Sequence, residues 1–277
     1  RIVKRGHGLD SIVNATRMLK DAGFKICYQM MPNLPGSSVE KDLKMFEQLF
    51  TDPRFKPDHL KIYPTATIKG TGLYRLWQDK RYIPYSDNEL KSLLKEIKKS
   101  IPRYVRIQRL IRDIPVQNIE AGTKVSNMRD IIAKESVQEG WSCNCIRCRE
   151  VKGFFDPDEK LKLFREDYEA SDGKEIFLSF RNENQEKLYS LLRLRISSQA
   201  IIRELHTYGK QLAVRDKKKS SPQHRGLGKR LVKEAEKIVL KESSLNRISV
   251  ISAVGVRGYY RKLGYRLNKT YMVKRLR

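Results

Sequence analysis

Two glycines, Gly226 and Gly228, precede a predicted amphipathic helix in the last third of the chain. Glycine lets the backbone turn tightly and leaves no side chain in the way of a ligand. The first turn of the following helix presents unpaired N–H groups and the positive end of its dipole, for which a phosphate is the natural occupant. The residues that we expect around such a phosphate are Gln223, His224, Arg225, Gly226, Leu227, Gly228 and Lys229. A glycine pair before a helix is common, so the pattern by itself is a weak signal.

Three cysteines, Cys143, Cys145 and Cys148, follow one another closely. In a reducing compartment such a group shares a metal ion more often than it forms a disulfide, and zinc suits tetrahedral thiolate sites. The sequence leaves the fourth ligand open between Cys27, His206, His224 and a water, and free thiols remain the alternative. The spacing does not fit a radical-generating iron–sulfur cluster.

Four arginines recur at every third position, at Arg103, Arg106, Arg109 and Arg112. This spacing places them on more than one face of a strand, so they are not all packed inside. One interpretation is a solvated edge strand. We favour the other, a nucleic-acid-binding rim that contacts phosphates at the mouth of a sheet.

The charge of the whole chain indicates a polyanionic partner. Its 277 residues include 58 Lys and Arg against 32 Asp and Glu, a net charge of +26. Nucleic acid is the simplest partner of so basic a surface. No apolar run approaches the ~20 residues of a membrane span and no secretory signal opens the chain, so we expect a cytoplasmic protein without a membrane partner.

The elements that must position these residues fall into two patterns. In residues 1–115, strands alternate with helices, which predicts a parallel α/β sheet that is too short to close a barrel and is the later part of something larger. The predicted helices are 11–22, 37–50 (with a capping box of Ser37 and Glu40) and 87–98, and the strands are 24–30, 59–63 and 104–110.

A short helix, 128–138, capped by Asn127, and the cysteines occupy a linker, 116–153. In residues 154–277 we expect a helix over 158–170, then strands 176–180, 189–196 and 200–206, the glycine loop and its helix, and strands 248–254 and 271–276. Residues 192–196 alternate Leu with Arg, which predicts one buried face and one wet, basic face.

The order strand, Gln223-x-x-Gly226-x-Gly228, long helix, strand, and then Tyr259-Tyr260-Arg261-Lys262-Leu263-Gly264-Tyr265 resembles the GNAT acetyltransferases. The resemblance implies an α+β domain in which the loop amides hold the pyrophosphate of acetyl-coenzyme A. It also implies that the pantetheine pairs with the strand before the loop, here 203–208, and that a tyrosine corresponding to Tyr260 lies near the thioester sulfur.

The resemblance extends to one family, that of the catalytic subunit of Elongator, over nearly the whole chain. It is carried by Ile202-Arg203-Glu204-Leu205-His206-Thr207-Tyr208-Gly209, by residues 250–265 and by the ending Tyr271-Met272-Val273-Lys274. In the first half Met30-Met31-Pro32-x-Leu34-Pro35, Lys61-Ile62-Tyr63-Pro64-Thr65, Gly70-Thr71-Gly72-Leu73-Tyr74 and Arg112-Asp113-Ile114-Pro115 carry it. Residues 143–151 resemble the zinc-bearing linker of the archaeal and bacterial members.

The resemblance implies a radical S-adenosylmethionine (SAM) barrel, here its later part at 1–115, joined through the linker 116–153 to a GNAT domain at 154–277. It implies a tRNA-modifying enzyme in which a [4Fe–4S] cluster cleaves SAM and the acetyl group of acetyl-coenzyme A becomes a carboxymethyl precursor on carbon 5 of the wobble uridine. The cluster cysteines belong upstream of Arg1, so we expect this chain to hold no cluster and to perform no radical step. The connection 197–201 is shorter than the family's usual loop.

Within this framework we expect catalytic roles for Tyr260 and Tyr259, since a departing thiolate needs a proton donor, and for His206 as a base. The coenzyme would contact Leu205, His206, Thr207, Tyr260 and the glycine loop, and SAM would contact Gln29, Met31 and Tyr63. For each of these residues the alternative is ordinary packing.

Two other functions stay open. A GNAT protein lysine acetyltransferase would use the same coenzyme site, but it calls for an acidic groove that binds a basic peptide, which the charge of this chain disfavours. A non-catalytic tRNA-binding module is the second. We expect tRNA as partner, with other Elongator-type subunits or with none.

Overall fold

A computed structural model describes residues 3–111, 114–152, 158–209 and 226–277. The chain forms two compact units. The first unit comprises Arg1–Leu9, Cys27–Asp52 and Lys56–Cys148, and the second comprises Asp10–Ile26, Pro53–Phe55 and Arg149–Arg277. Helix α1 (Leu9–Asp21) therefore belongs almost wholly to the unit of the C-terminal half. The division into 1–115, 116–153 and 154–277 stays a prediction.

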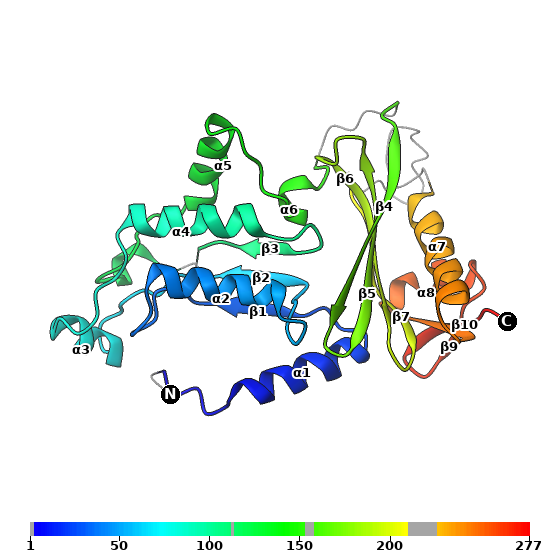
Figure 1. Cartoon of the computed structure of the whole chain (residues 1–277), viewed down its shortest axis with the longest axis horizontal. Coiled ribbons are helices and arrows are strands. Elements are labelled where there is room, and N and C mark those ends of the chain that lie inside the picture. The colour runs from blue at the N-terminus through cyan, green and yellow to red at the C-terminus, as the bar shows by residue number, and fades with distance from the viewer. Residues whose placement is uncertain (1–2, 112–113, 153–157, 210–225) are drawn as a thin grey trace. The chain divides into compact units, whose positions relative to one another are not determined.

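The first unit is built on a parallel sheet of three strands in the order β1-β2-β3 (Figure 1). The strands are β1 (Cys27–Met30), β2 (His59–Ile62) and β3 (Arg106–Arg109). Helix α2 (Val39–Thr51) links β1 to β2, and α3 (Gly72–Gln78) and α4 (Asp87–Ser100) link β2 to β3. After β3 come η1 (Val116–Asn118), α5 (Met128–Gln138) and α6 (Ile146–Arg149). The alternating pattern predicted this sheet, whereas α3 was not predicted.

A polar network holds the loop that leaves the carboxyl end of β1. Asn33 has a left-handed φ of 64°, and its backbone N–H donates to the carboxylate of Asp42 at 2.6 Å. The hydroxyls of Ser37 and Tyr85 donate to the same carboxylate at 2.6 and 2.9 Å, and that of Tyr82 donates to the backbone carbonyl of Asn33 at 2.9 Å. Asp42 is buried, so these bonds compensate for the loss of water around its charge.

The same network corrects the predicted start of α2. Ser37 donates to Asp42, and Ser38 is the N-cap, whose side chain accepts a bond from the backbone N–H of Lys41. The predicted capping box of Ser37 with Glu40 is therefore wrong, because the N-cap lies one residue later. In α4, by contrast, Ser86 and Glu89 do form a capping box.

The second unit contains a mixed sheet of seven strands in the order β4-β5-β6-β7-β8-β10-β9. Its strands are β4 (Leu161–Ala170), β5 (Gly173–Asn182), β6 (Leu188–Ile196), β7 (Ala200–Thr207), β8 (Arg247–Ile251), β9 (Arg266–Asn268) and β10 (Tyr271–Arg275). Neighbours are antiparallel except β7 and β8, which are parallel. Figure 1 shows β4 and β5 as a long twisted hairpin.

Helix α7 (Leu227–Glu242) covers one face of this sheet and forms the core of the unit. The apolar residues that predicted the helix, from Leu231 to Val239, are buried against Ile202, Ile248 and Val250 of the sheet. The loop after β8 leads through η3 (Val254–Val256) into the short helix α8 (Arg257–Arg261). None of the helices in the described ranges is both long enough and apolar enough to cross a membrane.

The predicted helix over 158–170 is wrong, because residues 161–170 form strand β4. The segment is rich in Lys, Glu and Leu, which favour helices in isolation. Its pairing with β5 along the whole length of the hairpin overrides that preference.

The predicted wet, basic face of β6 is also wrong. Arg193 and Arg195 are 1% and 0% exposed. Each has a carboxylate partner: Nε of Arg193 donates to Glu204 at 2.8 Å, and Nη1 of Arg195 donates to Glu175 at 3.1 Å. Ion pairing lets this face of the sheet be buried although it carries charge.

The C-terminal end of α1 is fitted closely to this sheet. The backbone N–H groups of Gly23 and Phe24 donate to the carbonyls of Lys20 and Leu19, a Schellman motif that requires the left-handed φ of 90° found at Gly23. A Cβ atom built on Gly23 would lie 2.6 Å from Cδ1 of Ile201 on β7. The glycine is therefore needed for space as well as for conformation.

We predict that Gly23→Ala destabilises the second unit more than Gly264→Ala does. Gly264 has nearly the same φ, 89°, but a Cβ atom there would meet its nearest neighbour at an ordinary 3.5 Å. Because only Gly23→Ala forces overlap, its free energy of unfolding in urea should fall by about 1–3 kcal/mol more than that of the control. Equal losses in the two variants would contradict the close fit of α1.

Candidate functional site

Strands β7 and β8 pair only over a short stretch. Their ladder joins residues 200–202 to residues 248–250, whereas the ladder of β7 with β6 continues to Thr207. Beyond Ile202 the two parallel strands therefore part. The later residues of β7 are Leu205, His206 and Thr207, which the sequence placed in the coenzyme site.

Three elements meet at Gly228 in the first turn of α7. A Cβ atom built on Gly228 would lie 3.7 Å from Cδ2 of Leu205, 3.7 Å from Oγ1 of Thr207 and 3.1 Å from the hydroxyl oxygen of Tyr259. The end of β7, the start of α7 and helix α8 thus converge, and among the converging residues are Leu205, Thr207 and Gly228, which the sequence predicted to contact the coenzyme. Because Gly228 has no side chain, the hydroxyl of Tyr259 can lie close to it.

The two tyrosines of α8 have different surroundings. Tyr260 is 5% exposed, and its ring packs edge-on against those of Tyr259 and Tyr265 with centroids 5.2 and 5.7 Å apart. Tyr259 is 38% exposed. Burial raises the pKa of both hydroxyls, so each stays protonated at neutral pH. Both hydroxyls can therefore donate a proton, and that of Tyr259 is the one that lies beside Gly228 among the converging elements.

The remaining predicted coenzyme residues are placed as follows. His206 is exposed, with its ring centroid 4.4 Å from that of Tyr208. Leu227 is buried in the core, so only its backbone can face a ligand, and Lys229 is exposed. Gly226 is the N-cap of α7 with a left-handed φ of 68°, and no side-chain hydrogen bond caps the helix in the described part of the chain. Gln223, His224 and Arg225 lie outside the described residues.

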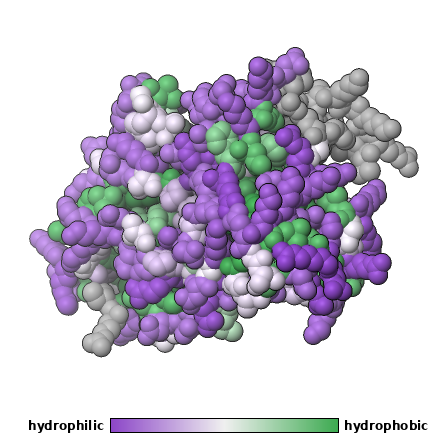
Figure 2. All heavy atoms as spheres, turned by 45° about the vertical axis from the view of Figure 1, so that its right-hand side comes forward, coloured by the Kyte–Doolittle hydropathy of each residue, from purple (hydrophilic) through white to green (hydrophobic). Residues whose placement is uncertain are grey.

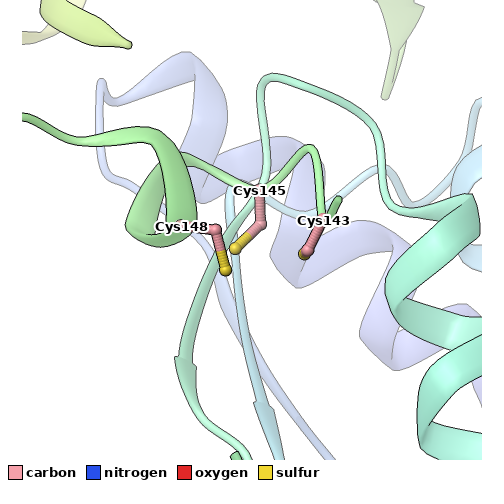
Figure 3. A group of neighbouring side chains, drawn as sticks. All are labelled: Cys143, Cys145 and Cys148. Carbon is pink, nitrogen blue, oxygen red and sulfur yellow. The ribbon is translucent and has the colours of Figure 1, made fainter. Parts of the chain in front are cut away.

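The three cysteines of the linker form one cluster. The sulfur atoms of Cys143, Cys145 and Cys148 all lie within 4.8 Å of one another, and Figure 3 shows their side chains directed toward a common point. Tetrahedral zinc with Zn–S bonds of about 2.3 Å separates its sulfurs by about 3.8 Å, so the cluster fits such an ion. Among the described residues no fourth His, Cys, Asp or Glu belongs to the cluster.

The candidates for a fourth ligand are thereby reduced. The thiol of Cys27 lies 3.7 Å from the side-chain oxygen of Gln108, outside the cluster. His206 is on β7 in the second unit and His224 is outside the described residues, so both of these candidates stay open.

Within the cluster the pKa directions favour a thiolate at Cys145 and protonated thiols at Cys143 and Cys148. Hydrogen bonds from Cys143 and Cys148 hold the pKa of Cys145 well below its usual range, while the shared bond with Cys145 raises the pKa of Cys143. The ammonium of Lys98, a residue that is 2% exposed, lies 3.7 Å from the sulfur of Cys148. A buried cation beside the sulfurs stabilises their negative charge. Sequence analysis missed Lys98, because it stands in a lysine-rich stretch of α4 that shows no sign of burial.

The residues predicted to contact SAM lie at the ends of neighbouring strands. Met31 follows β1 and Tyr63 follows β2, and the backbone N–H of Tyr63 donates to the carbonyl of Met30 at 2.8 Å. Gln29 is on β1, where it pairs with Lys61. These residues therefore lie at or near the carboxyl edge of the sheet, where ligands of such sheets bind.

The arginines are not gathered at that edge. Arg106 begins β3 and Arg109 ends it, and Arg103 precedes the strand. Arg109 is exposed, whereas Arg103 and Arg106 are half-buried. Arg112 lies outside the described residues. Arg106 and Arg109 stand at opposite ends of β3. The described arginines therefore do not form a single row of phosphate contacts at the carboxyl ends of the strands.

Comparison with known proteins gives the family. Residues 57–138, from just before β2 to the end of α5, match the radical SAM C-terminal domain. The chain is 43% identical, over its whole length, to "tRNA uridine(34) acetyltransferase" of Methanocaldococcus infernus, and covers 55% of that relative. It is 40% identical to "Elongator complex protein 3" of Homo sapiens and covers 53% of it.

A solved structure, "The archaeal Methanocaldococcus infernus Elp3 with N-terminus deletion (1-46)", superposes on 98% of the chain with a TM-score of 0.89 at 42% identity. The chain covers 68% of that structure. The chain belongs to the Elp3 family. It spans about half the length of the curated Elp3 relatives quoted above. Its architecture, a radical SAM C-terminal domain with a mixed-sheet domain, agrees with the Elp3 structure.

We predict that this Elp3 chain binds one equivalent of Co²⁺, a spectroscopic probe for zinc sites, with a thiolate-to-metal charge-transfer band. Cys145→Ser should abolish the band, because it removes the most buried sulfur of the cluster. Cys27→Ser is the matched control and should retain it, since that thiol lies outside the cluster. A band that survives in Cys145→Ser would contradict the shared site.

Proposed function

We propose that this chain binds acetyl-coenzyme A between β7 and α7 and acts as the acyl-coenzyme part of a tRNA uridine(34) acetyltransferase. The observation that carries the proposal is the meeting of Leu205, Thr207 and Tyr259 around Gly228. It joins the part of β7 that lies beyond its ladder with β8, the start of a helix and a tyrosine hydroxyl in one place. The GNAT resemblance likewise implies that the pantetheine pairs with the strand before the glycine loop and that the loop amides hold the pyrophosphate.

The coenzyme would use backbone groups more than side chains. Pantetheine contains two amides, which can pair with the edge of β7 beyond Ile202, where the ladder with β8 has ended. The pyrophosphate would lie before the first turn of α7, where N–H groups and the helix dipole favour negative charge. This assigns the glycine loop the phosphate-binding role that the sequence suggested.

The hydroxyl of Tyr259 would donate a proton to the departing sulfur. When water attacks the acetyl carbonyl, a C–O bond forms, the C–S bond breaks and the thiolate takes up the tyrosine proton, and the proton that the water loses returns to the tyrosinate. Since burial keeps Tyr259 protonated, it can supply that proton at neutral pH. Tyr260 would support the ring of Tyr259 from the core, which changes the order of the two tyrosines expected from the sequence.

Transfer RNA is the proposed acceptor. The net charge of +26 suits a folded RNA, and Figure 2 shows a face covered mainly by hydrophilic side chains with small apolar patches. The relative from Methanocaldococcus infernus is named for uridine 34 of tRNA, and the human relative is named as a protein of the Elongator complex. We propose carbon 5 of the wobble uridine as the site that receives the acetyl-derived group, with Elongator-type subunits as partners or with none.

In the whole protein, SAM and an iron–sulfur cluster would supply the radical that the carbon–carbon bond requires. In this chain Gln29, Met31 and Tyr63 would contact the nucleoside of SAM. Zinc is the metal we propose for the cysteine cluster. Its role would be structural, because the backbone N–H of Ile146, next to Cys145, donates to the carbonyl of Val105 at 2.9 Å and ties the cysteine loop to the start of β3.

We predict that hydrolysis of acetyl-coenzyme A by the chain rises when tRNA is added, because the acceptor completes the acetyl site. Release of free thiol measures the rate. Efficient acetylation of a histone-like peptide, with no effect of tRNA, would favour a lysine acetyltransferase. Binding of tRNA without any binding of acetyl-coenzyme A would favour a non-catalytic tRNA-binding module.

We predict that Tyr259→Phe lowers that rate by about 10²-fold or more, the usual contribution of a positioned acid, with little change in coenzyme affinity. Tyr260→Phe is the control, since it keeps the ring packing and removes a hydroxyl that is not among the three atoms nearest to a Cβ atom built on Gly228. A larger loss in Tyr260→Phe than in Tyr259→Phe would restore the assignment expected from the sequence.

A further inference from the structure

Strand β7 carries one residue more than its partner β6, at Arg203. Arg193 pairs with Glu204 and the next residue, Leu194, pairs with Ile202, so Arg203 forms a β-bulge. Side chains alternate between the two faces of a strand, and an extra residue shifts that alternation by one.

The bulge decides which side chains face the proposed coenzyme site. Ile202 points into the core beneath α7. In a regular strand Leu205, three positions later, would point to the opposite face. In the structure Leu205 packs against that same core, and it lies beside Gly228 together with Thr207, while Glu204 reaches Arg193 on the other face.

The side chain of Arg203 holds the bulge in place. Its Nε and Nη2 atoms donate to Oε2 of Glu175 at 3.2 and 3.0 Å, and its Nη1 donates to the backbone carbonyl of Phe24 at 2.6 Å. Arg203 is 2% exposed and Glu175 is 0% exposed. A planar guanidinium with several donors fixes an orientation that a single hydrogen bond would not.

The anchor of Arg203 is itself held. Oε1 of Glu175 accepts from Nη1 of Arg195 at 3.1 Å, and Nη2 of Arg195 lies 2.7 Å from the carboxylate of Asp21 at the end of α1. Two arginines thus face two carboxylates, so the charges of this network balance.

We infer that Arg203 is a positioning residue for the coenzyme strand: bound to Glu175 and to the carbonyl of Phe24, it keeps the bulge that turns Leu205 and Thr207 toward the coenzyme. The inference rests on the proposed binding of acetyl-coenzyme A at β7. Its expected effect is on the affinity for the coenzyme.

The test compares Arg203→Met with Arg181→Met. Arg181 is a matched control, because it is 1% exposed, lies in the same sheet on β5, and is paired with Glu166, away from β7. Calorimetric titration of the full chain with acetyl-coenzyme A should show a Kd about tenfold higher in Arg203→Met, the loss expected when a charged hydrogen bond that fixes the site is removed. Arg181→Met should bind as the unchanged chain does.

Hydrogen exchange gives a second readout that does not need the ligand. Backbone amides of β7 from Glu204 to Thr207 should exchange faster in Arg203→Met and at the original rate in Arg181→Met. Arg203→Lys keeps the charge beside Glu175 but, with one nitrogen, cannot serve both acceptors, so it should show the same changes to a smaller degree. If Arg203→Met does not fold, Arg203→Lys takes its place in both measurements.

Equal effects of Arg203→Met and Arg181→Met on Kd and on exchange in β7 would overturn the inference, since Arg203 would then act as any buried arginine of the sheet does. If the unchanged chain does not bind acetyl-coenzyme A, the proposed function fails. In that case faster exchange of β7 confined to the Arg203 variants still supports the positioning role, and unchanged exchange overturns it.

Discussion

One buried carboxylate, that of Glu175, organises the second unit. It lies between Arg195 and Arg203, and Arg195 continues the network to Asp21 at the end of α1. Arg195 also donates to the backbone carbonyls of Ala170 and Ser171 in the turn between β4 and β5. Because charges cannot be left unpaired in the interior, every element that contributes to this network is held in one arrangement. The hairpin β4–β5, helix α1 and strand β7 all contribute.

The other face of the same sheet is apolar and carries the proposed chemistry. Helix α7 packs on it with its regular apolar stripe, so the first turn of the helix lies at the place where β7 and β8 part. A glycine at that turn admits the hydroxyl of Tyr259 from α8. The charged face thus fixes the strands, and the apolar face places a helix start and a tyrosine over the gap between them.

The cysteine cluster depends mainly on residues that are close together in the sequence. Its three sulfurs come from six consecutive residues, and their spacing nearly suffices to bring them together. The fold supplies the surroundings: Lys98 from α4 brings a buried positive charge, and the backbone bond of Ile146 to Val105 fixes the loop at β3. A soft metal held there would tie these distant parts of the first unit together.

The sequence by itself determined whatever depends on local pattern. The spacing of apolar residues gave α7, α4 and the alternating strands of the first sheet, the cysteine spacing gave the cluster, and the paired motifs gave the family. Tertiary structure decided what depends on partners distant in sequence. The segment 161–170 is a strand because β5 pairs with it. Arg193 and Arg195 are buried because Glu204 and Glu175 lie opposite them. Tyr260 is buried in the core whereas Tyr259 stays exposed, and this difference in burial distinguishes the two tyrosines. The bulge at Arg203 belongs to the same class, since an extra residue in a strand can be recognised only against the strand with which it pairs.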